Sequence, residues 1–586
     1  MKKLLSIIIA LSVTATLSAQ STFTSTLKAK PSKGCNLYGT VECDGTPLAG
    51  VVVSDGYSVV KTDSTGKYEL ARNDKAKFVF YTTPATYEVA LSSDGYPLFY
   101  KTLADNTNLD FTLGKSITKH SEWHLYVMAD PQTNQTGKYC IPYFQNYMAT
   151  DIKSMVDREG YNSAENWNNN RLAYGMVLGD VIWNSAIESY MGKMKSAMAP
   201  ENTRVSWFTV PGNHDWYSSD SDKNPSLDCY HKIFGPSIYS FDRGDVHVVG
   251  MNNVLTGAGN SIEEYDQGFT TDEFNWLRKD LEMVPKDKCV VLCVHIQFFD
   301  GEAGVRHNKY YSQTLSLLRQ FANAYILSGH GHYARHWFHS NYNYIHEINH
   351  AAACGQFWNL KVCADGTPAG YYIYTFNGND CSNHFFKAAG TASSSEGSNA
   401  MRLYLGNDSY DPNMVCGYGK DNKVVYANLY NGYTSSSNTA DSSPLNKNWT
   451  VELFYKGSKV SDMTNVTKGN SSYGYHDKPS DYVDYYSTWL YNTNYLRNDA
   501  DWWFIAHGMN KKTTIKNRDG NKWNGAVSNS SYKKTTTHIF AGTLPEGVIL
   551  DSKDVMVRAT SPTGQVYEVS TFTKFSSYDG MAWELY

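Results

Sequence analysis

Short apolar runs recur through the middle of the chain, between about residues 119 and 375. They occupy 125–128, 174–178, 207–210, 246–249, 290–294 and 324–327. Because these runs are apolar on both faces, they predict strands that are covered on both sides. A helix is expected to start at Thr270, since Thr270 and Glu273 can form a capping box and apolar residues follow at helical spacing. Strands that alternate with helices predict a central α/β domain.

The segments on either side have a different pattern. Residues 21–118 contain short strand-like runs separated by turn signals such as Asp44-Gly45 and Asp55-Gly56, which predict a β-sandwich. This segment resembles the small immunoglobulin-like modules of secreted bacterial enzymes. Strand-like alternation returns at 424–426, 450–454 and 555–558 and predicts a β-rich domain over 376–586. The expected fold is multidomain, with the α/β domain over 119–375 between an N-terminal β-sandwich and a C-terminal β-rich domain.

The N-terminus predicts a signal peptide over residues 1–20. Lys2 and Lys3 form a positive region, an apolar stretch follows, and Ser18 and Ala19 offer a cleavage site. A retained membrane anchor is less favoured, because the apolar stretch is short and is interrupted by serine and threonine. No later stretch is long and apolar enough to span a bilayer, so no transmembrane segment is expected in the mature chain. We expect export to the periplasm or to the medium.

Composition narrows the possible partners. The 586 residues carry a formal net charge of −5, so there is no basic excess and nucleic acid is not an expected partner. Nothing in the sequence specifies an oligomeric state. In an exported chain Cys35 and Cys43, and Cys354 and Cys363, are close enough in sequence to pair across a hairpin, although sequence alone leaves their connectivity open.

Five short polar motifs each follow one of the central apolar runs. Their carboxylate, amide and imidazole groups suit borderline or hard divalent ions such as Mn, Fe, Zn or Mg. Two such ions a few ångströms apart stabilise both the entering and the leaving oxygen in a displacement at phosphorus. The motifs are Asp130-Pro131-Gln132, Gly179-Asp180, Gly212-Asn213-His214-Asp215, His295 and Gly329-His330-Gly331-His332.

A site for two ions needs a shared ligand. Asp180 is the candidate, because the two oxygens of its carboxylate can contact both ions. Gly179 lets the backbone turn sharply where the preceding strand ends. The first ion is expected to bind Asp130, Gln132, Asp180 and His332, and the second to bind Asp180, Asn213, His295 and His330.

His214 and Asp215 follow a proposed ligand and are the candidate catalytic residues. His214 is expected to face the phosphate of the substrate. Its imidazole can donate a proton to a leaving oxygen near neutral pH, so it is a general acid or a stabiliser of the developing charge. Asp215 either orients that imidazole or caps a helix that begins where the strand ends.

The ordered motifs are similar to those of the calcineurin-like metallophosphoesterase superfamily, whose pattern is DxH, GD, GNH followed by D or E, a lone H, and GHxH. All five blocks lie between residues 130 and 332, and Phe234-Gly235-Pro236 and 239–242 also resemble a family segment. The resemblance implies a four-layer α-β-β-α fold, two metal ions and hydrolysis by a metal-bridging hydroxide. The three-part layout resembles secreted bacterial members with added N- and C-terminal β-domains.

Gln132 departs from the family pattern, which usually has His at this position. A neutral amide oxygen binds borderline metals more weakly than imidazole does. The first site is therefore expected to be weaker, or to favour a harder ion such as Mn or Mg. The alternative is that Gln132 only lines the pocket.

Together these features predict an exported metal-dependent phosphoesterase that hydrolyses a phosphomonoester or a phosphodiester, with a small or envelope-derived substrate. Arg335, His336 and Trp358 are candidate substrate contacts, although surface positions explain them more simply. The alternative is a catalytically weak or inactive phosphoesterase-fold protein that binds glycans or the cell envelope, which an aromatic content of 14% would suit. The nearly complete set of ligands favours the enzyme.

Overall fold

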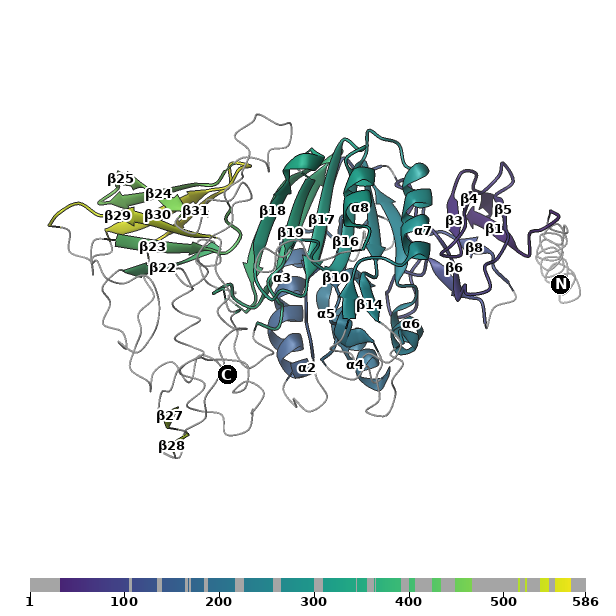
Figure 1. Ribbon diagram of the computed structural model, residues 1–586, viewed down its shortest axis with the longest axis horizontal. Coiled ribbons are helices and arrows are strands. Elements are labelled where there is room, and N and C mark those ends of the chain that lie inside the picture. Colours follow the sequence, from purple (N-terminus) through teal and green to yellow (C-terminus); the bar gives the residue numbers. More distant parts are fainter. Residues whose placement is uncertain are drawn as a thin grey trace, which may run out of the picture.

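The structure of the protein is a computed structural model, in which three parts follow one another along the chain (Figure 1). It describes residues 32–104, 108–117, 119–133, 140–163, 167, 170–183, 188–216, 226–256, 265–299, 309–343, 345–355, 363, 365–390, 400–405, 424–433, 448–465, 515–516, 522–523, 538–547 and 554–570. The expected signal peptide and the candidate substrate contact Trp358 lie outside these residues.

The N-terminal part contains two small sheets. Its strands are β1 (Leu37–Cys43), β2 (Thr46–Pro47), β3 (Val52–Ser54), β4 (Val59–Lys61), β5 (Lys67–Leu70), β6 (Phe78–Tyr81), β7 (Tyr100–Thr102) and β8 (Phe111–Thr112). In one sheet β1 pairs antiparallel with β2 and β5 and parallel with β8, and the other sheet has the antiparallel order β4-β3-β6-β7. Burial alternates along β1, so one of its faces lies in the core. The predicted N-terminal β-structure is confirmed.

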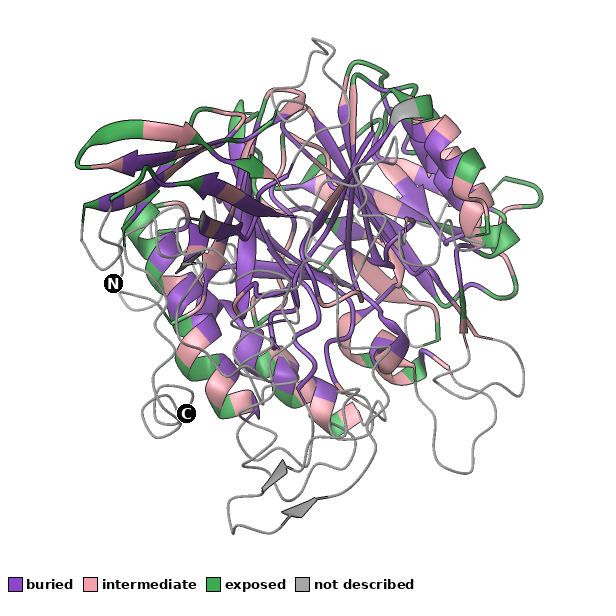
Figure 2. Cartoon of the chain, turned by 60° about the vertical axis from the view of Figure 1, so that its left-hand side comes forward, coloured by how far each residue is buried: buried purple, intermediate pink, exposed green. Residues whose placement is uncertain are grey.

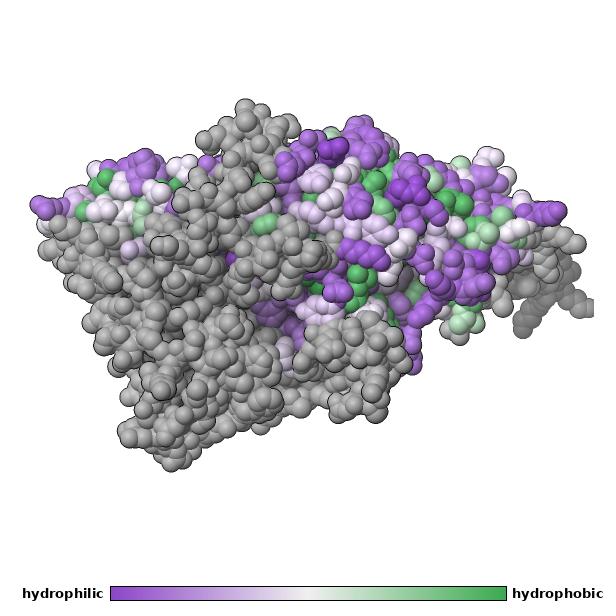
Figure 3. Space-filling model, in the orientation of Figure 1, coloured by the Kyte–Doolittle hydropathy of each residue, from purple (hydrophilic) through white to green (hydrophobic). Residues whose placement is uncertain are grey.

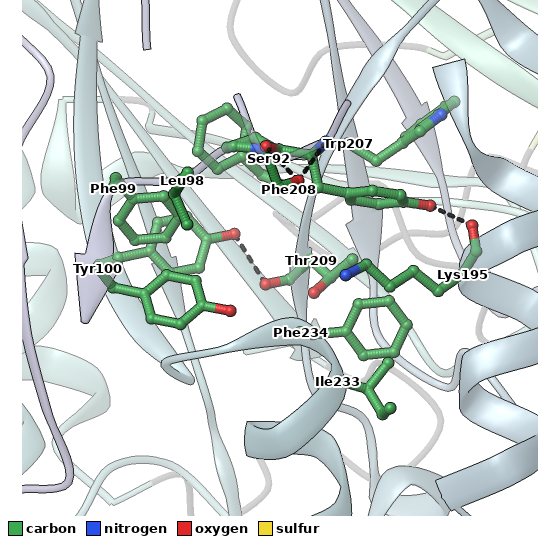
Figure 4. A pocket seen from close by; sticks show the side chains of 13 residues that line it. Ser92, Leu98, Phe99, Tyr100, Lys195, Trp207, Phe208, Thr209, Ile233 and Phe234 are labelled. Carbon is green, nitrogen blue, oxygen red and sulfur yellow. Dashed lines mark hydrogen bonds between the residues drawn. The ribbon is translucent and has the colours of Figure 1, made fainter. Parts of the chain in front are cut away.

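Charge and apolar packing hold this part against the central domain. Glu88 lies 2.9 Å from guanidinium nitrogens of both Arg171 and Arg243, and all three side chains are buried. Tyr100 of the N-terminal part and Phe234 of the central domain line a small pocket between the two parts (Figure 4).

Two sheets form the middle of the central domain. The first has the order β11-β10-β9-β20-β21, from β9 (Glu122–Met128), β10 (Ala173–Leu178), β11 (Ser206–Val210), β20 (Gly370–Asn377) and β21 (Asp380–Ala388). The second has the order β12-β13-β16-β17-β19-β18, from β12 (Ile238–Arg243), β13 (Val246–Met251), β16 (Cys289–Ile296), β17 (Asn323–Gly329), β18 (Arg335–His339) and β19 (Ile345–Asn349). A hairpin of β14 (Val254–Thr256) and β15 (Tyr265–Gln267) stands apart. The six predicted central strands are confirmed, and the first sheet extends past the expected boundary at residue 375.

Helices cover the outer face of each sheet. The first sheet packs on α2 (Cys140–Tyr143), η1 (Phe144–Ala149), α3 (Thr150–Glu159), α4 (Glu188–Met198), α5 (Pro200–Thr203) and α6 (Asp228–Phe234), and the second on α7 (Thr271–Glu282) and α8 (Tyr311–Leu318). The elements η2 (Asn213–Asp215) and η3 (Ser340–Tyr342) are single turns of 3₁₀ helix. Thr270 and Glu273 form both bonds of the predicted capping box at the start of α7. The four-layer α-β-β-α architecture is confirmed, with buried strands between half-exposed helices (Figure 2).

The C-terminal part contains two four-stranded antiparallel sheets with the orders β22-β23-β29-β26 and β25-β24-β30-β31, and a short hairpin of β27 and β28. The two larger sheets share a core that also includes Phe338 of β18. The expected strands near 424, 450 and 555 are confirmed. The elements are β22 (Met401–Leu405), β23 (Val424–Leu429), β24 (Thr450–Tyr455), β25 (Ser458–Asp462), β26 (Thr464–Asn465), β27 (Ile515–Lys516), β28 (Lys522–Trp523), β29 (Ile539–Thr543), β30 (Val555–Thr560) and β31 (Val566–Val569).

Hydrophilic side chains cover most of the described surface on the face in Figure 3, and hydrophobic ones form small patches. Within the described ranges, no helix has the length and apolar character needed to cross a membrane.

The cysteines that the structure describes carry no disulfide, so neither of the two possible pairings is present. The Cys43 thiol instead lies 3.1 Å from the carbonyl oxygen of Gly114, and the Cys363 thiol lies 3.6 Å from that of Ala352.

Candidate metal centre

The predicted ligands come together at the edge where the parallel strands of both sheets end. Asp130 follows β9, Asp180 follows β10 and Asn213 follows β11 in the first sheet. His295 lies near the end of β16 and His330 follows β17 in the second sheet. The carboxyl ends of parallel strands are where ligands collect in α/β folds. Both sheets therefore supply members of the group.

The backbone at these positions is strained. Left-handed backbone is uncommon for residues other than glycine and costs about 1–2 kcal/mol at each position. Strained backbone persists only where the surrounding structure holds it in place, and it is most common at functional sites. Positive φ angles between 33° and 65° are adopted by Asp130, Gln132, Asp180, His330 and His332.

Two glycines permit the close approach of the loops. Gly179 has a φ of 82°, and a Cβ at this position would lie 2.6 Å from Nδ1 of His295. A Cβ on Gly212 would overlap Oδ1 of Asp180. Any larger residue at either position would push the carboxylate and the imidazole apart.

One set of donors is tightly assembled around the predicted second ion. Asn213 Oδ1 lies 3.0 Å from both His295 Nε2 and His330 Nδ1. These two imidazole nitrogens are 3.2 Å apart, and His295 Nε2 lies 3.3 Å from Asp180 Oδ2. The ligand atoms of Asp180, His295 and His330 all lie within 4.8 Å of one another.

The hydrogen bonds of His295 direct a lone pair into this set. Its Nδ1 lies 2.8 Å from the carbonyl oxygen of Leu178, so Nδ1 would keep its proton when the ring binds a cation through Nε2. Nε2 then faces the oxygens of Asn213 and Asp180 with its lone pair. Such a convergence of acceptors fits a cation, as in metal sites where the second ring nitrogen donates to a carbonyl.

Asp130 and His332 form the other set. Asp130 Oδ2 accepts the backbone N–H of His330 at 2.9 Å. Asp130 Oδ1 is buried and accepts no hydrogen bond within the described part of the chain, and His332 Nε2 lies 3.3 Å from it. Because a buried carboxylate oxygen without a donor is costly, these residues also fit a divalent cation.

Gln132 lies between the two sets. Its amide nitrogen donates to Asp180 Oδ2 at 2.9 Å, and its oxygen lies 3.8 Å from the Cys354 thiol. A half-turn of the amide would direct the oxygen, the metal-binding atom, towards Asp180.

The electrostatic environment of the site keeps the Asp180 carboxylate ionised. Burial favours a raised pKa for Asp180, but His295, His214 and His330 hold it well below its usual range. Burial would lower the pKa of His295, whereas the Asp180 carboxylate overrides burial and raises it to about 9. Asp180 is thus anionic and surrounded by groups that compensate its charge.

His214 lies at the half-buried rim of this group. Its Nε2 is 4.0 Å from Asp180 Oδ2, and its backbone N–H donates to Asp180 Oδ1 at 2.9 Å. Burial lowers the pKa of His214, and the Asp180 carboxylate opposes that shift. The imidazole is therefore next to the predicted ions without belonging to either ligand set.

Two aromatic residues at the site were not anticipated from the sequence. Trp183 stacks on the His214 imidazole with ring centroids 4.6 Å apart and planes inclined by 22°. The Tyr265 hydroxyl lies 3.1 Å from His330 Nε2, on the side opposite the metal-facing nitrogen. Trp183 follows Asp180 by three residues, and that proximity was a usable signal. Tyr265 comes from the separate β14–β15 hairpin, and no motif marks it.

Asp215 does not orient the His214 ring, which corrects the first of its two predicted roles. Its carboxylate accepts backbone N–H groups from Gly212 at 2.8 Å, Val181 at 3.0 Å and Ile182 at 3.4 Å. It therefore closes a local cap at η2 and fastens the loop that follows Asp180. Burial and the nearby Asp180 carboxylate raise the pKa of Asp215 to about 7.

Two candidate substrate contacts lie elsewhere. Both ring nitrogens of His336 are within hydrogen-bonding distance of other residues, His346 at 3.0 Å and Asn431 at 3.2 Å. His336 thus belongs to the contact between the central and C-terminal domains and not to a substrate surface. Arg335 is buried, with its guanidinium 4.4 Å from the centre of the Tyr333 ring, so packing also explains this residue.

Three family models match consecutive parts of the chain. The model described as calcineurin-like phosphoesterase matches residues 128–334, and those for the N terminal and C terminal of calcineurin-like phosphoesterase match 35–116 and 347–488. No curated protein matches the chain.

Solved structures similar to this one share little sequence with it. A purple acid phosphatase from yellow lupin (Lupinus luteus) seeds is 12% identical over 57% of this chain, with a TM-score of 0.32, and 66% of its own length is covered, just under two thirds. PhoD is 9% identical over 57% of this chain and 79% of its own, with a TM-score of 0.28. A 5'-nucleotidase from Candida albicans is 9% identical over 74% of this chain and 90% of its own, with a TM-score of 0.29.

Proposed function

Because the chain belongs to the calcineurin-like phosphoesterase family, with the N- and C-terminal domains of that family, we propose that it hydrolyses phosphoric esters at a centre of two divalent metal ions. The substrate is a phosphomonoester or a phosphodiester. The observation that carries the proposal is the convergence of seven donor residues from both sheets, five of them with left-handed backbone.

The residues divide into two ligand sets that share one carboxylate. Asp180 is the shared ligand, because its Oδ2 accepts from Gln132 and also approaches His295, so this oxygen lies between the two sets. When bound, the two ions supply the positive charge that polarises a phosphoryl group and activates water. Mn or Mg suits the first set, in which the donors are oxygens apart from a single imidazole.

His214 acts on the leaving group. It is half-buried beside Asp180, and the stacked Trp183 restrains the plane of its ring. The imidazole donates a proton, or a hydrogen bond, to the oxygen that departs from phosphorus. Asp215 contributes by binding the backbone of the loop after Asp180.

We also propose that the enzyme acts outside the cytoplasm. The positive and apolar N-terminus and the small residues at 18 and 19 support export. N-terminal sequencing of the protein recovered from the periplasm or the medium would identify the cleaved chain. A chain that keeps Met1 there would contradict cleavage.

The test compares nitrophenyl phosphate with bis-nitrophenyl phosphate after chelation and after addition of Mn²⁺, Mg²⁺ or Zn²⁺. We expect two ions per chain and metal-dependent turnover of at least one ester. Asp180→Asn is expected to remove most of the metal and nearly all activity while the fold is kept. Asp266→Asn makes the same change at an exposed carboxylate and serves as the matched control.

Two outcomes would contradict the proposal. If Asp180→Asn keeps a rate within a few-fold of the unaltered protein, Asp180 is not the shared ligand. If the chain binds neither metal nor ester but retains glycans, it is the binding protein considered as the alternative.

A further inference from the structure

The loop that carries His332 is fastened by a buried carboxylate that is not among the proposed ligands. Asp365 Oδ2 accepts the backbone N–H of Ala334, two residues after His332, at 2.7 Å. The same carboxylate accepts the backbone N–H and the hydroxyl of Thr367 at 3.0 and 2.9 Å. Asp365 is fully buried. A charged acceptor therefore fixes where the metal loop ends.

The C-terminal domain holds this carboxylate in place. His538, directly before β29, has its Nε2 3.2 Å from Asp365 Oδ2 and its Nδ1 2.6 Å from Asn428 Oδ1. Asn428, on β23, donates to the carbonyl oxygen of Asp365 at 2.9 Å. Arg402, on β22, donates to the carbonyl oxygen of Gly366 at 3.1 Å. Three strand segments of the C-terminal domain thus bind one turn of the central domain.

Close packing connects that turn to the metal centre. Small side chains fill the space between them and form a separate buried cluster, and close-packed interiors transmit displacements. The cluster also reaches the first ligand set, because the Cys354 thiol lies 3.8 Å from Gln132 Oε1. Its members are Ala334, Ala351, Ala352, Cys354 and Cys363.

The strained loop needs restraint at both ends. His330 and His332 have φ angles of 65° and 55°. On one side the N–H of His330 donates to Asp130, and on the other the N–H of Ala334 donates to Asp365. Loss of the second restraint would let the His332 ring leave its position beside Asp130.

We propose that Asp365 and His538 are positioning residues, through which the C-terminal domain holds His332 in its metal-binding geometry. The inference rests on the proposed function in one respect only, which is that His332 is a metal ligand. Outer partners of metal ligands change metal affinity by about 10–100-fold. The C-terminal domain thereby sets the affinity of the first ion.

The first measurement needs neither metal nor substrate. Amide hydrogen exchange of the full chain is followed in chelator over a peptide spanning residues 330–336. We expect His538→Ala to speed exchange in this peptide, and we expect His538→Gln, whose amide can still donate to Asp365, to restore part of the protection. Asn431→Ala is the matched control, because Asn431 crosses the same domain boundary to His384 and His336 without contacting Asp365.

The second measurement is binding of Mn²⁺ to the same variants. We expect His538→Ala to weaken one of the two ions by about tenfold and to leave the other unchanged, whereas Asn431→Ala leaves both unchanged. Unaltered exchange and affinity in His538→Ala, or equal losses in Asn431→Ala, would overturn the inference. If His538→Ala does not fold, amide exchange and Mn²⁺ binding are measured on Asp365→Asn instead. This variant keeps the side-chain volume and is expected to give the same results.

The inference and the proposed function fail separately. A protein that binds two Mn²⁺ ions but hydrolyses no phosphoester would contradict the function and leave the role of His538 intact. If the protein turns over esters, but neither His538→Ala nor Asp365→Asn changes amide exchange in the 330–336 peptide, only the inference is contradicted.

Discussion

We expect mild acid to destabilise the protein through buried histidines between the central and C-terminal domains. His336 and His346 lie on the paired strands β18 and β19, and His384 lies on β21. Asn431 of the C-terminal domain joins them, with its side-chain nitrogen 2.8 Å from His384 Nδ1 and its oxygen 3.2 Å from His336 Nε2. His336 Nδ1 is in turn 3.0 Å from His346 Nε2.

These bonds are all satisfied when every ring is neutral. The Asn431 amide donates to His384 Nδ1 and accepts from His336 Nε2. The remaining nitrogen of His336 then accepts from His346 Nε2. An added proton on any of these acceptor nitrogens would set one donor against another in a buried site, at the cost of a hydrogen bond and of an uncompensated charge.

The magnitude follows from the pKa values. Burial lowers the pKa of His384 to about 3 and that of the nearby His350 to about 4, and it holds those of His336 and His346 well below their usual range. A folded-state pKa below the unfolded value means that the unfolded chain binds more protons. The stabilisation that the neutral histidines contribute is therefore complete above about pH 6.5 and is lost as the pH falls. At pH 5, His384 and His350 each cost about 2 kcal/mol, against a total stability of about 5–15 kcal/mol.

Urea unfolding in chelator, at several pH values between about 7.5 and 5, measures this loss without a contribution from bound metal. The comparison is with His384→Asn, which keeps an oxygen to accept from Asn431. We expect the unaltered protein to lose about 1.4 kcal/mol more per pH unit than this variant below about pH 6. Parallel curves for the two proteins would refute the assignment of a neutral, depressed His384.

Three further predictions concern the site and the N-terminal contact. His214→Ala is expected to keep both metals and to slow turnover by about 10²–10⁴-fold. The loss is expected to be largest for poor leaving groups, so equal losses across a series of aryl phosphates would exclude the general acid. Tyr265→Phe removes the hydroxyl beside His330 Nε2, and dialysis should show one Mn²⁺ ion held about tenfold more weakly. Glu88→Gln leaves two buried guanidiniums without their carboxylate and should lower the free energy of unfolding by about 3–5 kcal/mol, measured in urea at pH 7.5.

Strand positions and the residues that meet at the candidate site were predictable from the sequence, because both depend on local patterns. The run 174–178 is apolar throughout and forms β10. Gly179 and Asp180 follow this strand, at the edge where the candidate site lies. The capping box at Thr270 is equally local. Adjacency to a motif does not reveal that β18 buries Arg335 and brings His336 within 3.2 Å of Asn431 in the C-terminal domain.

The residues that sequence could not supply are those that hold the loops. A ligand with left-handed backbone leaves the N–H groups of the next residues turned away from any strand partner, so a buried acceptor has to come from another element. Carboxylates supply it for two such ligands, since Asp215 binds amides after Asp180 and Asp365 binds the amide of Ala334 after His332. Glu347 likewise binds the amide of Phe298, although His295 itself lies in strand β16.

Each of these carboxylates is distant in sequence from the amides that it binds, and each of these bonds is buried. Glu347 comes from β19 and Asp215 from η2, both within the central domain. Asp365 alone is bonded by side chains of the C-terminal domain among these three. The last ligand loop therefore depends on a domain that carries none of the proposed ligands, and a shortened chain that ends after β21 would keep every motif while losing the partner of Asp365.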